Sequence, residues 1–332
     1  MTSLNSENCP QTLIDIPNYT QFSTAHVTHI INDTKYAVHS IVGRANEDRS
    51  NLCILNGKIL MYAIYDGHGG CDVSNYLKDR LPEKIADMLS YHDWNDESVI
   101  IYSITNAFVS LDFEMWNQNE FIGRFSGSTA TVVLSYGGKI YMAHVGDSRA
   151  ILADRNGHIL LETADHDGYN RSEIERITNL GGFVSSGVVP RISGLAVTRA
   201  FGNFNKGCKI SPNGYRSDWY VSVVPEVNVF NKVDQNPILL LIASDGLWDG
   251  KYKKSSNVLK MINDINNCLS TKYFHIDMGY NRLHPHVDIG SNKGPTMVDI
   301  INAKQLCHHI ALKGHENYAG YKDDITVITA FI

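Results

Sequence analysis

Aspartates stand at the ends of several apolar, strand-like segments of this 332-residue chain. Three such segments run into an Asp beside a Gly, at Asp66-Gly67, Gly146-Asp147 and Asp245-Gly246. A fourth segment is preceded by the acidic pair Asp323-Asp324. A single Asp-Gly pair is common in turns, but its repetition at strand ends indicates that the carboxylates converge on one edge of the core.

Carboxylates held close together need cations between them, because they repel one another and raise each other's pKa. Ligation by oxygen alone favours Mg2+ or Mn2+, hard ions that keep several waters. His68 lies near this predicted site and has the ordinary pKa of a general acid. Arg44 has a guanidinium suited to a pair of phosphate oxygens. These residues alone do not choose phosphate over another hydrolysable group.

The elements that would position these residues form an α+β pattern. Residues 58–65 are expected to form a buried strand that stops at Asp66, and amphipathic helices are expected over about 71–90 and 97–118. Short β-type segments with Gly-Gly, Gly-Asp and Asn-Gly turns cover 129–162 and are typical of an antiparallel meander. Many short strands with helices inserted in blocks indicate an antiparallel sandwich flanked by helices.

Further elements are expected in the second half of the chain. We expect a short helix and then two β-type segments. A pair of late helices and a final β-type segment should follow. The expected ranges are helix 172–180, strands 220–230, 238–244 and 325–332, and helices near 255–268 and 297–313.

Composition excludes several classes of protein. The formal net charge of −6 argues against a general nucleic-acid binder. We expect no membrane span, because no apolar run approaches ~20 residues, and the N-terminus lacks the pattern of a signal peptide. We therefore expect an intracellular protein, cytoplasmic or nuclear. Six cysteines without a C-x-x-C pair disfavour a zinc site and a disulfide framework alike.

Nine short motifs occur in an order that is specific to one protein family. They are Asp66-Gly67-His68-Gly69-Gly70, Gly127-Ser128-Thr129-Ala130, Gly146-Asp147-Ser148-Arg149-Ala150, Asp165-His166, Gly181-Gly182-Phe183-Val184, Leu195-Ala196-Val197-Thr198-Arg199-Ala200, Pro225-Glu226-Val227, Ser244-Asp245-Gly246-Leu247-Trp248-Asp249 and Asp323-Asp324-Ile325-Thr326. Over about residues 36–332 the chain thereby resembles the metal-dependent protein phosphatases of type 2C.

The resemblance implies a four-layer α/β/β/α sandwich, with two antiparallel β-sheets flanked by helices. It implies hydrolysis of phosphoserine and phosphothreonine in phosphoprotein substrates, with two Mg2+ or Mn2+ ions, a weaker third ion, and a water between the first two that attacks phosphorus. In this assignment Asp66 bridges the two ions and the Gly67 carbonyl binds one of them. Asp245 and Asp323 hold the other.

The resemblance assigns roles to five further residues. Asp147 would join Asp245 at the third ion, and Glu47 and Asp48 would support metal-bound waters. His68 would protonate the leaving serine or threonine oxygen, and Arg44 would hold the phosphate.

The expected organisation is an N-terminal extension over 1–35 and a single phosphatase domain over 36–332. Within that domain we expect a flap at about 165–215 that borders the active site, and an insertion at about 269–296. We expect a monomer that binds no nucleic acid.

Some positions depart from the family pattern. Arg44 stands three residues before Glu47 instead of four, and Asn203 stands where the family has Asp. These departures keep an alternative open, a catalytically weak pseudophosphatase that acts as a partner-binding module. The retained metal-site aspartates and His68 favour the enzyme. A hydrolase of small phosphate esters would use the same site.

Overall fold

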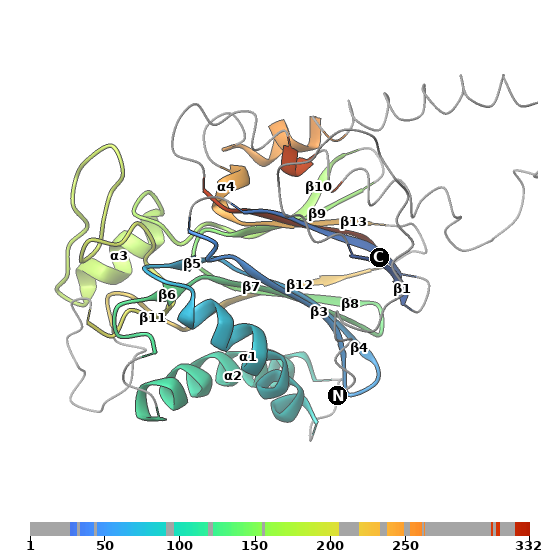
Figure 1. Ribbon diagram of the computed structural model, residues 1–332, viewed down its shortest axis with the longest axis horizontal. Coiled ribbons are helices and arrows are strands. Elements are labelled where there is room, and N and C mark those ends of the chain that lie inside the picture. The colour runs from blue at the N-terminus through green and yellow to red at the C-terminus, as the bar shows by residue number, and fades with distance from the viewer. Residues whose placement is uncertain are drawn as a thin grey trace, which may run out of the picture.

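Two antiparallel β-sheets lie face to face and helices cover their outer faces (Figure 1). The computed structural model describes residues 27–31, 34–42, 45–90, 96–118, 122–154, 157–205, 219–232, 238–248, 253–260, 262, 307, 310–312 and 323–332. The first sheet has the strand order β1-β2-β14-β13-β9-β10, and the second has the order β12-β8-β7-β4-β3. A small third sheet has the order β11-β6-β5.

The strands of each sheet come from distant parts of the chain. The first sheet contains β1 (Val27–Ile31), β2 (Thr34–Ile41), β14 (Ile325–Phe331), β13 (Leu239–Ala243), β9 (Arg149–Ala153) and β10 (Ile159–Glu162). The second contains β12 (Glu226–Asn231), β8 (Lys139–Val145), β7 (Ala130–Tyr136), β4 (Ile59–Tyr65) and β3 (Arg49–Leu55). The third contains β11 (Phe201–Gly202), β6 (Gly127–Ser128) and β5 (Gly67–His68). The helices are α1 (Asp72–Leu89), α2 (Glu97–Gln118), α3 (Arg171–Asn179) and α4 (Asp245–Trp248).

Each apolar strand supplies two hydrophobic cores, because successive side chains point to opposite faces of a sheet. In β4, Met61 and Ala63 pack with the apolar faces of α1 and α2. Tyr62 and Ile64 instead pack between the two sheets. A third core lies between the first sheet and α4 with the helical residues 255–260. These three cores separate four layers, which confirms the expected α+β class.

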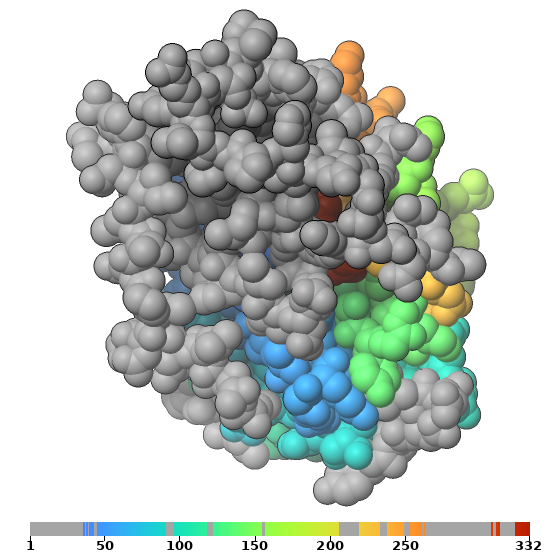
Figure 2. All heavy atoms as spheres, turned by 90° about the vertical axis from the view of Figure 1, so that its right-hand side faces the viewer, coloured from blue at the N-terminus to red at the C-terminus, as the bar shows by residue number. Residues whose placement is uncertain are grey.

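The two sheets end in hairpins at the side of the molecule opposite the small third sheet. Figure 2 views that side and shows the β3–β4 turn in blue beside the β7–β8 turn in green. Among the described residues no helix is long and apolar enough to cross a membrane.

The chain crosses from the second sheet to the first at Gly146-Asp147. The expected single meander over 129–162 is wrong at this point, because β8 pairs with β7 and β9 pairs with β10, in different sheets. Gly146 has a φ of 101°, in the region that favours glycine. A Cβ at Gly146 would also lie 2.5 Å from Thr129 Cγ2. The crossing leaves Asp147 at the junction of the sheets.

Regular structure begins before the expected start near Tyr36. Strand β1 pairs with β2 in an antiparallel hairpin, with Val27 opposite Val38. A five-residue strand in a polar stretch produces too short a pattern to stand out in the sequence. The strand expected over 220–230 is shorter, because β12 begins at Glu226, just after Pro225, which has no N–H to donate to a strand ladder. Residues 1–26, 206–218 and the expected insertion at 269–296 lie outside the described residues.

A buried ion-pair network orders the segment that contains α3. Glu173, whose side chain is only 1% exposed, accepts hydrogen bonds from Arg176 at 2.8 Å, Arg199 at 2.7 Å and Thr198 at 2.9 Å. Burial alone would raise the pKa of Glu173, but the hydrogen bonds and charges of Arg199 and Arg176 lower it to about 2. This network joins α3 to the segment that leads into β11.

Glu173→Gln is expected to lower the free energy of unfolding by about 3–5 kcal/mol at neutral pH, because it leaves the partly buried guanidinium groups of Arg176 and Arg199 without their buried carboxylate. The pKa of Glu173 is depressed in the folded state, so its stabilisation is present above its ordinary pKa of 4.5 and is lost as the pH falls toward about 2. Urea unfolding of both proteins across this range measures the difference. Glu175→Gln is the control, since the exposed pair Arg171–Glu175 on the same helix should contribute under ~1 kcal/mol. Equal losses in both variants would contradict the network's role.

Candidate functional site

The second sheet places two acidic side chains at one edge. In the β3–β4 pair, Arg49 lies opposite Tyr65. Asp48 precedes Arg49 and Asp66 follows Tyr65, so the register brings these two carboxylates to the same end of neighbouring strands. The fully buried side chains of β4 fix this register, because a one-residue slip would exchange its two faces.

The first sheet contributes acidic residues in the same way. Strand β13 is antiparallel to β14, with Ala243 opposite Val327. Asp245 follows the end of β13 and Asp323 precedes the start of β14, so both lie at one edge of this sheet. The backbone hydrogen bond from Ser244 N–H to the Thr326 carbonyl, 3.1 Å long, extends the pairing toward the acidic residues.

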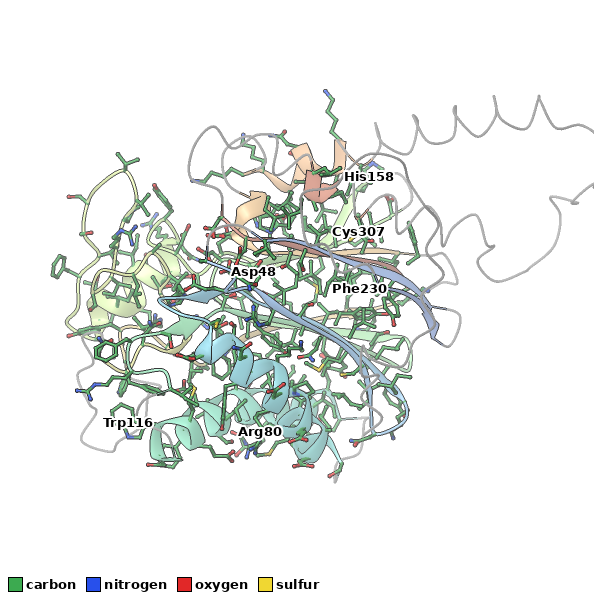
Figure 3. The ribbon with its side chains drawn as sticks, in the orientation of Figure 1. Asp48, Arg80, Trp116, His158, Phe230 and Cys307 are labelled. Atoms are coloured by element: carbon green, nitrogen blue, oxygen red, sulfur yellow. The ribbon has the colours of Figure 1, made fainter. Side chains whose placement is uncertain are left out.

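Hydrogen bonds join the two edges. The Ser244 hydroxyl donates to Asp48 Oδ2 at 2.8 Å, which links the first sheet to the second. Asp324, buried before β14, accepts from the backbone N–H of Glu47 at 2.5 Å and of Asp48 at 3.2 Å. Figure 3 labels Asp48 at the junction of the sheets. These bonds hold carboxylates from both sheets in one group.

The carboxylates of this group perturb one another. Burial raises the pKa of Asp66 well above its ordinary value, and the charges of Asp245, Asp48, Asp147 and Asp323 raise it further. The structure therefore brings together the aspartates that the sequence singled out at four separate strand ends. We call Asp48, Asp66, Asp147, Asp245 and Asp323 the acidic cluster.

Asp48 and the adjacent Glu47 also have raised pKa values. Burial raises the pKa of Asp48 to about 7, and the charges of Asp324 and Asp323 add to the rise, against hydrogen bonds from Ser244 and Thr326. Burial also raises the pKa of Glu47. The Glu47 carboxylate accepts the Gly70 N–H at 2.5 Å, so it is directed toward the loop that follows β5.

Gly67 and His68 form β5, beside Asp66. The backbone of Gly67 packs against Glu47, since a Cβ on Gly67 would lie 2.7 Å from the Glu47 carbonyl oxygen. The Nε2 atom of His68 lies 2.8 Å from Oδ1 of the buried Asn203. Gly127 is required beneath this pair, because a Cβ there would clash with both side chains.

Three site features went beyond the sequence analysis. Asn203 departs from the family pattern in sequence, but its contact with His68 becomes visible only in the structure. Asp324 and Ser244 were not recognised as the groups that join the sheets, although both adjoin assigned residues. Arg44 lies outside the described residues.

The family profile described as protein phosphatase 2C matches residues 37–267. The chain belongs to this family. Protein phosphatase 1L of Bos taurus is 32% identical over 223 residues, which are 64% of this chain and 59% of that protein. Probable protein phosphatase 2C 9 of Arabidopsis thaliana is 34% identical over 223 residues, which are 64% of this chain and 72% of that protein.

Solved structures of this family share the fold. A serine-threonine phosphatase 2C from Toxoplasma gondii aligns with a TM-score of 0.65 at 19% sequence identity, covering 94% of this chain and 99% of that one. The alignment supports the α+β architecture over almost the whole length.

Asp66→Asn is expected to stabilise the protein in the absence of divalent ions. The pKa of Asp66 is raised in the folded state, so its ionisation disfavours folding increasingly as the pH rises above its ordinary value of 3.8. In EDTA the variant should therefore melt at a higher temperature than the wild type at pH 8, with a smaller difference at pH 5. On addition of Mg2+ the melting temperature of the wild type should rise more than that of the variant, because a cation compensates a carboxylate charge that the variant lacks.

Thermal unfolding in EDTA and in Mg2+ measures both effects. Asp79→Asn, which removes an exposed carboxylate on α1, is the matched control and should leave both melting temperatures unchanged. A lower melting temperature for Asp66→Asn in EDTA at pH 8 would show that the cluster is not under electrostatic strain.

Proposed function

We propose that this chain is a protein serine/threonine phosphatase, which hydrolyses phosphoserine and phosphothreonine with Mg2+ or Mn2+. The observation that supports this most directly is the acidic cluster, in which strand ends of both sheets direct carboxylates to one place. The chain's family, whose members are metal-dependent, supports the same reaction.

The cluster has the donors that hard divalent ions need. Its side-chain donors are all oxygens. Burial and the charges of neighbouring carboxylates raise the pKa values of Asp48 and Asp66, and a divalent cation bound among them would relieve this repulsion. Two such ions would supply an acidified water as the nucleophile and would neutralise charge on the phosphoryl group. Magnesium and manganese share this preference, so the donor set does not distinguish them.

Each acidic residue has a proposed part in holding these ions. Asp66 and the Gly67 carbonyl would bind at the second sheet, and Asp245 and Asp323 at the first. Asp147, at the crossing between the sheets, would bind a weaker third ion together with Asp245. Glu47 and Asp48 would orient metal-bound waters.

His68 is the proposed general acid for the leaving oxygen. The Asn203 amide oxygen accepts its Nε2–H and orients the ring without adding the negative charge that Asp would bring. Arg44 is proposed to hold the phosphate. We further propose that the chain has an N-terminal extension over 1–35 and one phosphatase domain over 36–332. This domain would contain an insertion at about 269–296, and the protein would be a monomer.

Turnover of a phosphothreonine peptide is expected to require Mn2+ or Mg2+ and to stop in EDTA. Asp245→Ala is expected nearly to abolish turnover at low metal concentration while the fold persists, because it removes a ligand at the sheet edge and no core packing. Phosphate release, with circular dichroism as the fold check, measures this, and Asp79→Asn is the fully active control. Full activity of Asp245→Ala at low metal concentration would refute the site. A folded, ion-binding wild type without turnover would support the pseudophosphatase.

His68→Gln is expected to slow hydrolysis of the phosphothreonine peptide by roughly 100-fold, because an alkoxide is a poor leaving group without a proton donor. Hydrolysis of p-nitrophenyl phosphate, whose leaving group needs no proton, should change far less. Comparing kcat for the two substrates isolates the proton donor. Equal slowing for both would assign His68 a positioning role instead.

A further inference from the structure

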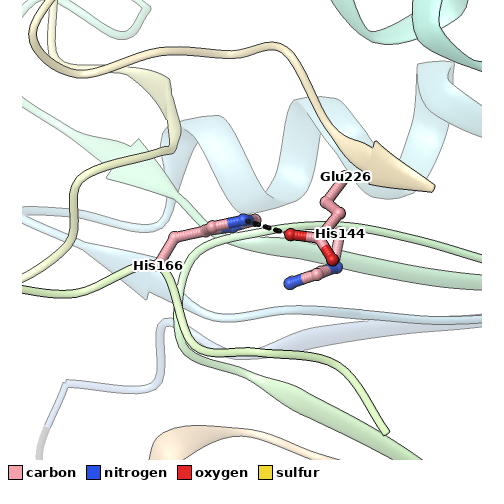
Figure 4. A group of neighbouring side chains, drawn as sticks. All are labelled: His144, His166 and Glu226. Carbon is pink, nitrogen blue, oxygen red and sulfur yellow. Dashed lines mark ion pairs between the residues drawn. The ribbon is translucent and has the colours of Figure 1, made fainter. Parts of the chain in front are cut away.

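A second group of metal-ligating side chains lies outside the acidic cluster. His144, His166 and Glu226 each offer a ligand atom, and these three atoms lie within 4.8 Å of one another. Figure 4 shows the Glu226 carboxylate beside both imidazoles. No role of the acidic cluster uses these residues.

The fold brings these residues together from three segments. His144 on β8 lies directly opposite Glu226 on β12, so their side chains share one face of the second sheet. His166 follows β10, and its backbone is held on both sides. Its N–H donates to the Gly146 carbonyl at 2.9 Å, and its carbonyl accepts the Thr198 N–H at 2.8 Å.

The two imidazoles are buried, and three of their four ring nitrogens make no hydrogen bond. The rings of His144 and His166 are stacked, with centroids 4.3 Å apart and planes 9° apart, and neither residue is exposed. Both nitrogens of His166 and Nδ1 of His144 have no hydrogen-bond partner. Buried polar atoms are nearly always paired, so three orphaned nitrogens at one place indicate a missing ligand.

One hydrogen bond prepares His144 to bind a metal. Its Nε2 lies 2.8 Å from the Ala164 carbonyl oxygen, which can only accept, so the proton resides on Nε2 and Nδ1 carries a lone pair. Histidines that bind metals commonly donate their other nitrogen to a carbonyl or carboxylate in this way. Burial lowers the pKa of His144, and lowers that of His166 to about 4, so both rings are neutral at physiological pH.

We propose that His144, His166 and Glu226 bind one zinc ion, which ties β8 and β12 to the segment that follows β10. Two imidazoles and a carboxylate form an established zinc ligand set, and Mg2+ prefers oxygen alone. Ligand atoms of a filled tetrahedral site lie roughly 3–3.5 Å apart. Glu226 Oε2 is already 3.5 Å from His166 Nε2.

The surroundings admit a cation. The Glu226 side chain is 42% exposed, so an ion can enter from solvent and keep a water as its fourth ligand. The nearby positive charge of Arg199 opposes a further cation, and it lowers the pKa of both histidines. Its guanidinium is compensated by Glu173 at 2.7 Å, and it also donates to the Val224 carbonyl.

Zinc binding to the full-length chain in excess Mg2+ tests the proposal, because Mg2+ fills the acidic cluster and leaves the nitrogen site to zinc. We expect one zinc per chain by elemental analysis after gel filtration. Co2+ should give the intense visible absorption of a four-coordinate site. Wild-type protein that retains no zinc under these conditions would overturn the proposal.

Two variants locate the ion. Glu226→Gln removes a ligand at a half-exposed position, and His144→Asn removes a ligand but keeps an amide donor for the Ala164 carbonyl. Each should weaken zinc binding at least ~10-fold and remove the cobalt absorption, with an unchanged circular dichroism spectrum. Unchanged zinc affinity in Glu226→Gln would overturn the proposal even if His144→Asn fails to fold.

Two control variants exclude other zinc sites. Asp245→Ala alters the acidic cluster and should keep the zinc, and His158→Asn removes an exposed histidine and should also keep it. Loss of zinc in either control would place the ion elsewhere and overturn the proposal.

Discussion

The repulsion among carboxylates at the junction of the two sheets is the constraint on which the rest of the structure depends. Partly buried acids such as Asp48 and Asp66 have raised pKa values, so their ionisation opposes folding unless cations are present. The chain resists this repulsion with neutral groups, because the Ser244 hydroxyl and backbone N–H groups bond the acids across the junction. The apolar cores on both faces of each sheet supply the remaining stabilisation.

The position of this junction follows from sheet topology. Strand pairing is antiparallel within each sheet, so the end of one strand and the start of its neighbour lie at the same edge. The crossing at Gly146 then connects the sheets directly beside that edge. Residues distant in sequence, such as Asp66 and Asp323, reach one place without a long loop between the sheets. Near this edge the space around two glycines is already filled by side chains, since a Cβ at Gly127 would meet Asn203 and His68 and one at Gly146 would meet Thr129.

Local pattern was sufficient to predict much of the fold. The ranges expected for α1, α2, β13 and β14 agree with the observed elements to within one residue at each end, because apolar periodicity is a local property. The division of 129–162 between two sheets could not be predicted, since Gly-Asp between two strands is compatible with a hairpin or with a crossing. The convergence of the aspartates was predictable from their strand ends, but the bonds from Asp324 and Ser244 depend on how the sheets are stacked.

The group formed by His144, His166 and Glu226 could not be predicted from the sequence either, because it also depends on how the strands pair. His144 and Glu226 are 82 residues apart in sequence, and only the β8–β12 register places them opposite each other. Yet the two candidate metal sites are linked through the end of β8, because His144 lies on this strand and Asp147 follows two residues after the strand ends at Val145. The Gly146 carbonyl between them accepts the His166 N–H. Nitrogen ligands at one site and oxygen ligands alone at the other favour different ions at the two neighbouring positions. An ion on the histidines would thus fix the backbone from which Asp147 reaches the acidic cluster.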